Sequence, residues 1–433
     1  MNVSRTFALS AALAVLLTGT TMPAAGAEPD TLTVEHAVQL ALDHHPSLRS
    51  AEANTRGAVA QHKGAVAGYL PAVSFSASAT HTEGVFVFNP SVPSRNQIYS
   101  SYTGGFQAQE TIFDFGKTIN RVSSATDLAD AASMDELTAR ELVIANVQIA
   151  YYGLLAARGV ADVNDEAVKQ ADKHLVQAKA FYSVGTRPRF DVTKAEVDLA
   201  NARVNQIIAK NQMQVAQVQL ENAMGFHPEA PYAVGRSLPH PQVAMTMDSA
   251  RTLAARQRPE LLAAQSRVEA AVAQARAAWS QHLPVLSAFG SWNWSGFDPT
   301  PLYPRWSAGI QLTLPIFQGF ALDAQVEQAN AAADAAQAAF DTQAQSVLLE
   351  VEQAYLGLRE AEERKVATAK LVNQADENFT LAQRQYAAGV GTAIEVADAQ
   401  LSRSNALITD IQAQYDYITS IVKLRRALGT ASN

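Results

Sequence analysis

Four short segments of the chain alternate between apolar and polar residues. Residues 72–81 and 102–111 set alanine, valine and phenylalanine against serine, threonine and glutamine, and residues 285–294 and 305–314 repeat this pattern. Alternation with a period of two is typical of a β-strand with one apolar face. Each segment has about ten residues, the length of a tilted strand that crosses a membrane. We therefore predict two hairpins of amphipathic strands.

A proline-free segment of helical character follows each hairpin. Residues 117–182 and 320–386 could each form one helix of about 100 Å. Within residues 322–361 the apolar positions alternate in steps of four and three, with one slip near Ala344. This spacing predicts a coiled-coil seam interrupted by a stutter.

Two shorter helices are predicted over residues 35–69 and 190–224, each about 50 Å long. Stacked end to end, two helices of this length would match one long helix. We therefore expect each half of the chain to read helix, hairpin, very long helix, turn and helix.

The two halves of the chain resemble each other in sequence. Matching residues lie 213 positions apart in the first part of each half and 204 positions apart in the rest. The informative matches involve proline, tyrosine and glycine: Pro46 with Pro259, Tyr182 with Tyr386, and Gly185 with Gly389. A constant offset over many such pairs indicates an internal duplication. Residues 226–249, which contain Pro228, Pro231, Pro239 and Pro241, are predicted to link the halves.

The N-terminus has the features of a secretory signal. Arg5 precedes an apolar run over residues 7–17, and Ala25-Gly26-Ala27 fits the small-residue cleavage rule. We predict that residues 1–27 are a removed signal peptide and that the protein is exported.

Composition narrows the function classes. The 433 residues include no cysteine, which excludes disulfides and thiolate chemistry, and the formal charge of -8 argues against nucleic-acid binding. No later segment offers the roughly 20 apolar residues of a membrane-spanning helix.

Few residues have the spacing of a catalytic or metal site. Asp114-Phe115-Gly116 spells a kinase triplet, but no glycine-rich loop accompanies it. His44-His45 could bind a metal ion, yet a surface pair at a helix end explains it more simply. We therefore predict no enzyme, no cofactor and no metal.

The predicted strands carry aromatic residues near their ends, namely Trp292, Trp294, Tyr303 and Trp306. Such residues form the girdle of a membrane β-barrel, although ordinary core aromatics would also fit. Four strands cannot close a barrel, because the smallest need about eight. A dimer would supply about eight strands and a trimer about twelve.

This architecture resembles the TolC-like outer membrane efflux proteins over about residues 35–430. The resemblance is most specific at the turn over residues 182–187, at its counterpart over residues 386–389, and at the closing segment over residues 424–429. It implies a mostly α fold in which duplicated units, residues 28–225 and 250–433, form a trimeric α-barrel and share a twelve-stranded β-barrel. The barrel would sit in the outer membrane of a Gram-negative bacterium, and the helices would extend into the periplasm.

The resemblance also implies a gate at the periplasmic tip of the helices. Its acidic rings map onto Glu395 and Asp398, and its linking network onto Tyr386 and Asp191. The family's arginine partner would fall at Gly391, so that link is absent, and Arg187 in the other repeat could replace it. Contacts for a periplasmic adaptor are expected at the turn tips: Val184, Gly185, Thr186, Gly389, Val390 and Gly391.

The residues support the acidic part of this gate independently. Glu395 and Asp398 are three apart and so share one helix face. Three copies would gather like charges around a narrow axis, where multivalent cations would bind. The alternative is an ordinary solvated helix face.

The function that these expectations favour is the exit duct of a tripartite small-molecule efflux system, with an adaptor and an inner-membrane pump as partners. A duct for one-step protein secretion remains an alternative. A soluble periplasmic coiled-coil adaptor is a third possibility, but it would not need duplicated ten-residue amphipathic strands.

Overall fold

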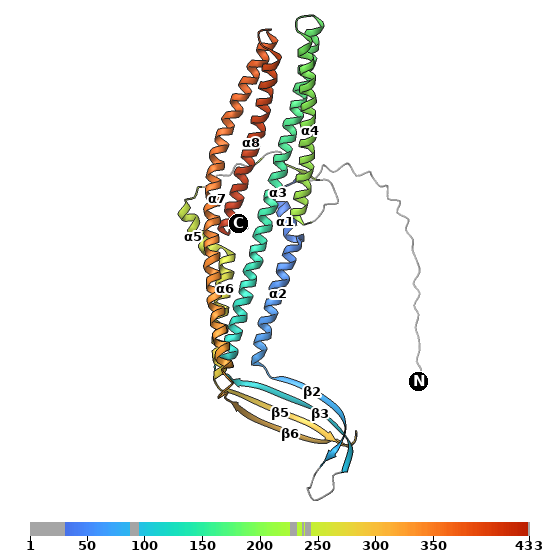
Figure 1. Cartoon of the computed structure of the whole chain (residues 1–433), viewed down its shortest axis with the longest axis vertical. Coiled ribbons are helices and arrows are strands. Elements are labelled where there is room, and N and C mark those ends of the chain that lie inside the picture. Colours follow the sequence, from blue (N-terminus) through green and yellow to red (C-terminus); the bar gives the residue numbers. More distant parts are fainter. Residues whose placement is uncertain (1–30, 87–94, 226–231, 236–237, 239–243, 432–433) are drawn as a thin grey trace, which may run out of the picture.

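The computed structural model describes residues 31–86, 95–225, 232–235, 238 and 244–431. The chain is a long column of helices with a four-stranded sheet at one end (Figure 1). The predicted signal peptide lies outside the described residues. None of the described helices combines the length and the apolar character needed to cross a membrane.

The helices form two sets of matching length. The first set is α1 (Val34–His44), α2 (Pro46–Val66), α3 (Lys117–Ser183) and α4 (Arg189–Met224). The second set is α5 (Met247–Gln257), α6 (Pro259–Trp279), α7 (Ala321–Ala387) and α8 (Ala393–Leu428). Both sets have lengths of 11, 21, 67 and 36 residues, in the order that a duplicated unit predicts.

The prediction of one helix over residues 35–69 was wrong. The segment breaks at His45, whose backbone is extended, and short 3₁₀ turns end α2 (η1, Ala67–Tyr69) and α6 (η2, Ser280–His282). Pro46 causes the break, because proline disfavours a helical residue before it and lacks the N–H that a continuing helix needs. Pro259 starts α6 in the same way.

The sheet has the order β2-β3-β5-β6, with neighbouring strands antiparallel. Its strands are β2 (Ala72–Phe86), β3 (Arg95–Phe113), β5 (Val285–Gly296) and β6 (Tyr303–Thr313). The first hairpin is longer than predicted, because residues 82–86 and 95–101 continue the ladder beyond the predicted strands. These residues include valine, isoleucine, threonine and tyrosine, which favour strands. Two short strands, β1 (Thr31–Leu32) and β4 (Ala233–Val234), pair in parallel elsewhere.

The two faces of the sheet differ in polarity, as predicted. The register aligns Phe75, Phe106, Trp292 and Trp306 in one row across the four strands, on the apolar face. The next row along the strands, Ser74, Gln107, Ser291 and Ser307, lies on the opposite, polar face. The apolar face is open in the single chain, where Trp306 is 80% exposed. A large exposed apolar surface of this kind needs a lipid or protein neighbour.

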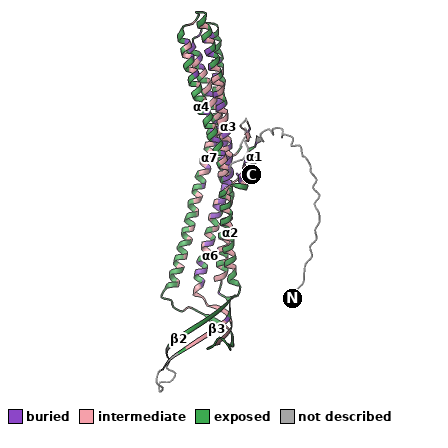
Figure 2. Cartoon of the chain, turned by 90° about the vertical axis from the view of Figure 1, so that its right-hand side faces the viewer, coloured by how far each residue is buried: buried purple, intermediate pink, exposed green. Residues whose placement is uncertain are grey.

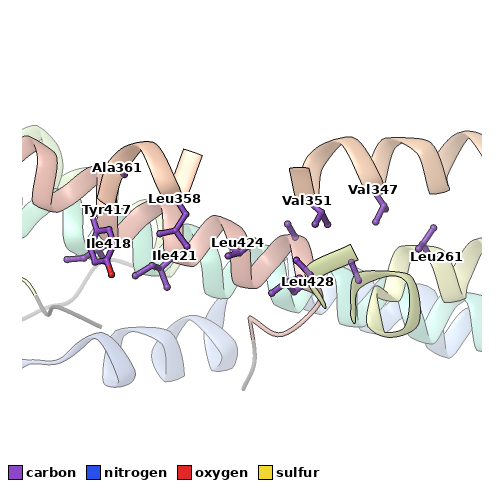
Figure 3. Packing of buried hydrophobic residues seen from close by; sticks show 13 residues of the cluster. Leu261, Val347, Val351, Leu358, Ala361, Tyr417, Ile418, Ile421, Leu424 and Leu428 are labelled. Atoms are coloured by element: carbon purple, nitrogen blue, oxygen red, sulfur yellow. The ribbon is translucent and has the colours of Figure 1, made fainter. Parts of the chain in front are cut away.

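The core of the column consists of seams between helices. Burial gathers where α3, α4, α7 and α8 meet, whereas α2 and the part of α7 nearest the sheet are largely exposed (Figure 2). On α7 the predicted coiled-coil positions Val347, Val351, Leu358 and Ala361 are buried, which confirms the seam after its slip. The predicted positions before the slip, from Leu322 to Phe340, are half-buried. They pack against residues of α5, α6 and α8 in one cluster (Figure 3).

The end of each 36-residue helix lies against a break between two shorter helices. Gly225 ends α4 with φ 76°, and a Cβ there would lie 2.8 Å from the Cα of His45. Gly429 ends α8 with φ 73°, and a Cβ there would lie 2.8 Å from the carbonyl oxygen of Gln257. Glycine is needed at both positions for the left-handed backbone and for the close approach.

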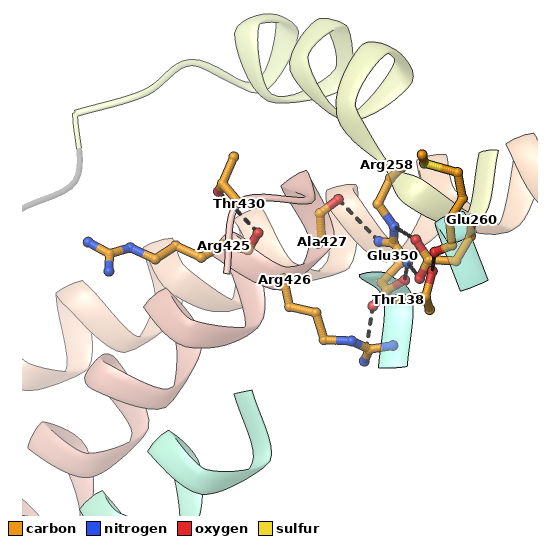
Figure 4. A network of polar contacts seen from close by, with 9 residues as sticks. Thr138, Arg258, Glu260, Glu350, Arg425, Arg426, Ala427 and Thr430 are labelled. Atoms are coloured by element: carbon orange, nitrogen blue, oxygen red, sulfur yellow. Dashed lines mark hydrogen bonds and ion pairs between the residues drawn. The ribbon is translucent and has the colours of Figure 1, made fainter. Parts of the chain in front are cut away.

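A buried arginine ties the second of these joints together (Figure 4). Arg258 is 2% exposed, and its guanidinium donates two hydrogen bonds of 2.9 Å to Glu260 and one of 2.7 Å to Glu350 of α7. It also donates to the carbonyl of Ala427, 3.1 Å away near the end of α8. Four donated bonds satisfy a charge that would otherwise be costly to bury.

Glu141 of α3 is a buried carboxyl beside this cluster. Burial and the nearby charge of Glu260 raise its pKa to about 7, and Arg258 and Arg426 only partly oppose them. The charged form of Glu141 is therefore disfavoured in the folded protein.

Gly429→Ala is expected to lower the free energy of unfolding by about 2–4 kcal/mol, because left-handed strain adds to overlap with the backbone of Gln257. The control is Gly185→Ala, which has similar φ but nothing within 4 Å of the added Cβ. It should lose about 1 kcal/mol. Denaturant unfolding in detergent, followed by circular dichroism, measures both. Equal losses would contradict the close-packed joint.

Glu141→Gln is expected to flatten the pH dependence of stability. The pKa of Glu141 is raised by folding, so its contribution to stability is present below about pH 4.5 and lost as pH rises through about 7. The variant should gain stability over the parent protein as pH rises from 5 to 8. Melting temperatures across this range test the expectation, with the exposed Glu363→Gln as control. Parallel pH curves for Glu141→Gln and the parent would refute it.

Candidate functional site

The two helical hairpins end in similar turns at the tip of the column. Gly185 (φ 73°) follows α3 and Gly389 (φ 84°) follows α7, and nothing lies within 4 Å of a Cβ added at either. Glycine is therefore needed at both positions for the left-handed backbone conformation that reverses the chain, and not for lack of space. Val184 and Val390 are 71% and 81% exposed, and Thr186 is also exposed. Gly391, in contrast, is buried, unlike the other residues predicted to contact an adaptor.

A cluster around Tyr386 joins the tips of the two repeats. Tyr386 of α7 is 1% exposed, and its hydroxyl donates to Oδ2 of Asp191 on α4 at 3.5 Å, the long limit of a hydrogen bond. The Arg187 guanidinium lies 5.0 Å from the centre of the Tyr386 ring, within the range of a cation–π contact. Its Nη2 donates to the carbonyl of Gly391 at 2.8 Å. The structure thus brings Arg187, Asp191, Tyr386 and Gly391 together.

Two residues of this cluster were not predicted from the sequence. His174 and Phe181 of α3 contact the Tyr386 ring edge-on, with ring centres 5.1 and 5.8 Å away. Burial lowers the pKa of His174, and burial with the charge of Asp191 raises the pKa of Tyr386. Both side chains are therefore neutral at pH 7. The sequence could have indicated His174 by its spacing, because it lies three residues after Ala171 and four before Ala178, on the same face of α3 as these buried alanines.

Glu395 and Asp398 lie in the first two turns of α8, and both are exposed. Glu395 belongs to a capping box: the Thr392 N–H donates to its Oε2 at 2.7 Å, and its own N–H donates to Thr392 Oγ1 at 3.3 Å. The carboxylate thus stabilises the helix start as well as adding charge. Asp398 is one turn further along the same face.

The predicted aromatic girdle divides between the two faces of the sheet. Trp292 and Trp294 of β5 have ring centres 6.1 Å apart, and Trp306 of β6 lies directly opposite Trp292. These three residues share the apolar face. Tyr303 is paired with Ser295 and so lies on the polar face. Within the described ranges, no group of three or more histidine or acidic side chains could hold a metal ion.

A family model described as outer membrane efflux protein matches residues 37–226 and 250–430, most of the chain. Outer membrane protein OprJ of Pseudomonas aeruginosa is 27% identical over 400 residues, which cover 90% of this chain and 83% of OprJ. The toluene efflux pump outer membrane protein TtgC of Pseudomonas putida is 25% identical over 407 residues, covering 92% of this chain and 82% of TtgC.

A solved structure with the same fold is the Campylobacter jejuni CmeC outer membrane channel. It superposes with a TM-score of 0.83 at 18% identity, over 95% of this chain and 94% of CmeC. The fold, with its column of paired long helices and its small amphipathic sheet, is that of an outer membrane channel. The chain belongs to the outer membrane efflux protein family, and it is an outer membrane channel for efflux.

Proposed function

We propose that three copies of this chain assemble into one duct, with a shared twelve-stranded barrel in the outer membrane and a helical tunnel in the periplasm. The duct receives small molecules from an inner-membrane pump through a periplasmic adaptor and releases them outside. The family, and the name of TtgC as a toluene efflux pump protein, support small molecules as the cargo. A cleaved signal over residues 1–27 would direct the chain to export.

The observation that carries the assembly is a second seam on α4. One side of α4 packs on α3 through buried residues that include Ala195, Leu199, Ala209 and Leu220. Two residues after a buried position the helix has turned by about 200°, so these positions lie on the opposite side of α4. There they carry exposed apolar residues in steps of seven, four and three. These are Val197, Val204, Ile208, Val215 and Val218. A seam with this spacing is the surface that a helix of a second copy would cover.

The sheet, like α4, has surfaces that a single chain leaves uncovered. In the described chain β2 and β6 are its edges, and an exposed edge invites pairing with another strand. Pairing of each β6 with the β2 of a neighbour would close the barrel and turn the apolar face toward lipid. The three tryptophans on that face would then form a belt in the membrane.

At the tip, the cluster around Tyr386 holds the two hairpins of one copy together. Arg187 bridges the repeats through Tyr386 and Gly391. Loss of these contacts would let the hairpins separate and open the tunnel. Glu395 and Asp398 would line its narrow end, and the exposed Val184, Thr186 and Val390 would meet the adaptor.

Val204→Asp with Ile208→Asp is expected to prevent the trimer while leaving the fold of the protomer intact, because both side chains are exposed in the single chain. Mass in detergent by light scattering reports the assembly, and circular dichroism reports the helices. Gln214→Asp, an exposed position of α4 outside the seam, is the control and should remain trimeric. A trimeric double variant would exclude this seam as the interface.

Glu395→Gln with Asp398→Asn is expected to weaken block of the channel by a trivalent cation at least about tenfold, since up to six carboxylates are neutralised. Glutamine keeps an oxygen that can accept from Thr392, so the helix cap is retained. Single-channel recordings in a planar bilayer measure the half-blocking concentration. Asp334→Asn with Glu363→Gln removes the same charge far from the tip and serves as control. Unchanged block in the first variant would remove these residues from the gate.

A further inference from the structure

We infer that Arg305, with its two copies in the trimer, forms a ring of positive charge inside the outer half of the barrel, and that this ring binds multivalent anions. The inference rests on the proposed trimeric duct and adds a determinant of which solutes it favours. Its basis is the position of Arg305 in the sheet, the surroundings of its side chain and the uncharged residues at the neighbouring polar-face positions of the strands.

The strand register assigns Arg305 to the polar face. Arg305 is the partner of Asn293, which in turn is the partner of Gly105, and Gly105 is opposite Ser76. Paired residues point to the same side of a sheet. This row therefore shares the polar face with Ser291 and Ser307, whose hydroxyls are 2.9 Å apart. Trp306 and Phe106 lie on the other face of the sheet. In a barrel with its apolar face toward lipid, the row faces the lumen.

The position of Arg305 along the barrel axis follows from its place in β6. It lies two residues into β6, which begins at Tyr303. That end adjoins the β5–β6 turn, away from the helices (Figure 1). The ring would therefore lie near the outer opening, at the far end of the duct from Glu395 and Asp398.

The neighbours leave the guanidinium available. The Asn293 carboxamide leans toward β3, because a Cβ added at Gly105 would lie 2.1 Å from Asn293 Oδ1. Its amide nitrogen donates to Ser291 at 3.3 Å. Asn293 thus turns away from Arg305 and leaves it without this acceptor. Arg305 is exposed, and among the described residues no carboxylate forms an ion pair with it.

Within the strand segments nearer the helices and around Arg305, Arg305 is the one charged residue on the polar face. Over residues 72–83, 98–113, 285–296 and 303–313, every other polar-face position is an uncharged residue, chiefly serine, threonine, glutamine or glycine. A single arginine per copy would therefore set the potential of this part of the lumen.

Arginine suits anion binding better than the other cations. Its guanidinium stays charged at any physiological pH, and its planar fork donates paired hydrogen bonds to carboxylate or phosphate oxygens. Three such forks around a lumen of low-dielectric walls attract a multivalent anion more strongly than a monovalent one. The duct would thus combine an acidic inner end with a basic outer end.

The test is block of single channels by inorganic tripolyphosphate. The tripolyphosphate is added on the side of the barrel opening, whereas a trivalent cation that blocks at Glu395 and Asp398 is added on the other side. Arg305→Gln should raise the half-blocking concentration at least tenfold and shift the reversal potential in a KCl gradient toward cation selectivity. Arg305→Lys, which keeps the charge, should stay within about threefold of the parent. Ser307→Gln adds bulk to the same face without charge and should leave block unchanged.

Open trimeric channels of Arg305→Gln that tripolyphosphate blocks as in the parent would overturn the ring while leaving the duct in place. A parent protein that forms no channels would instead overturn the proposed duct, and the ring with it. The two failures are therefore distinguishable in one set of recordings.

Discussion

A single helix of 67 residues stays in one piece only if neighbours cover it along its whole length. Helices in proteins gain most of their stability from packing of an apolar face, and among the described elements only the second long helix is as long. Each repeat therefore lays three shorter helices along its long helix, and the end of the 36-residue helix lies against the break between the other two. The joints at Gly225 and Gly429 are where that cover is made continuous, which explains why the backbone approaches so closely there.

The seams themselves are thin, because alanine supplies many of the buried positions. Small side chains let helices approach but bury little apolar area each. The stability of the column must therefore come from many shallow contacts rather than from one deep core. In the single chain, apolar rows on α4 and on the sheet also remain strongly exposed. The single chain forms its own helices and sheet, but it leaves large apolar surfaces exposed.

Periodicity made much of this architecture predictable. The steps of four and three on α7 and the alternation in the strands depend only on geometry, and both matched the structure. The break at His45 was missed because the apolar pattern continues across Pro46, although proline chemistry overrides it. Tyr303 was grouped with the tryptophans by proximity in sequence, yet its odd spacing from Trp306 puts it on the other face. The contacts of Tyr386 with His174 and Arg187 join residues about two hundred positions apart, which no local pattern encodes.

The repeats agree in every helix length but differ in their strands, with 15 and 19 residues in the first hairpin against 12 and 11 in the second. Helix length is locked, because an insertion in one long helix would mismatch its shorter partners and its counterpart in the other repeat. Nothing comparable restrains the hairpin ends, where extra rungs add to a ladder without displacing any neighbour. Over evolutionary time, change in such a chain should therefore accumulate at the far ends of the hairpins, whereas the helical column can alter only through several coordinated insertions at once.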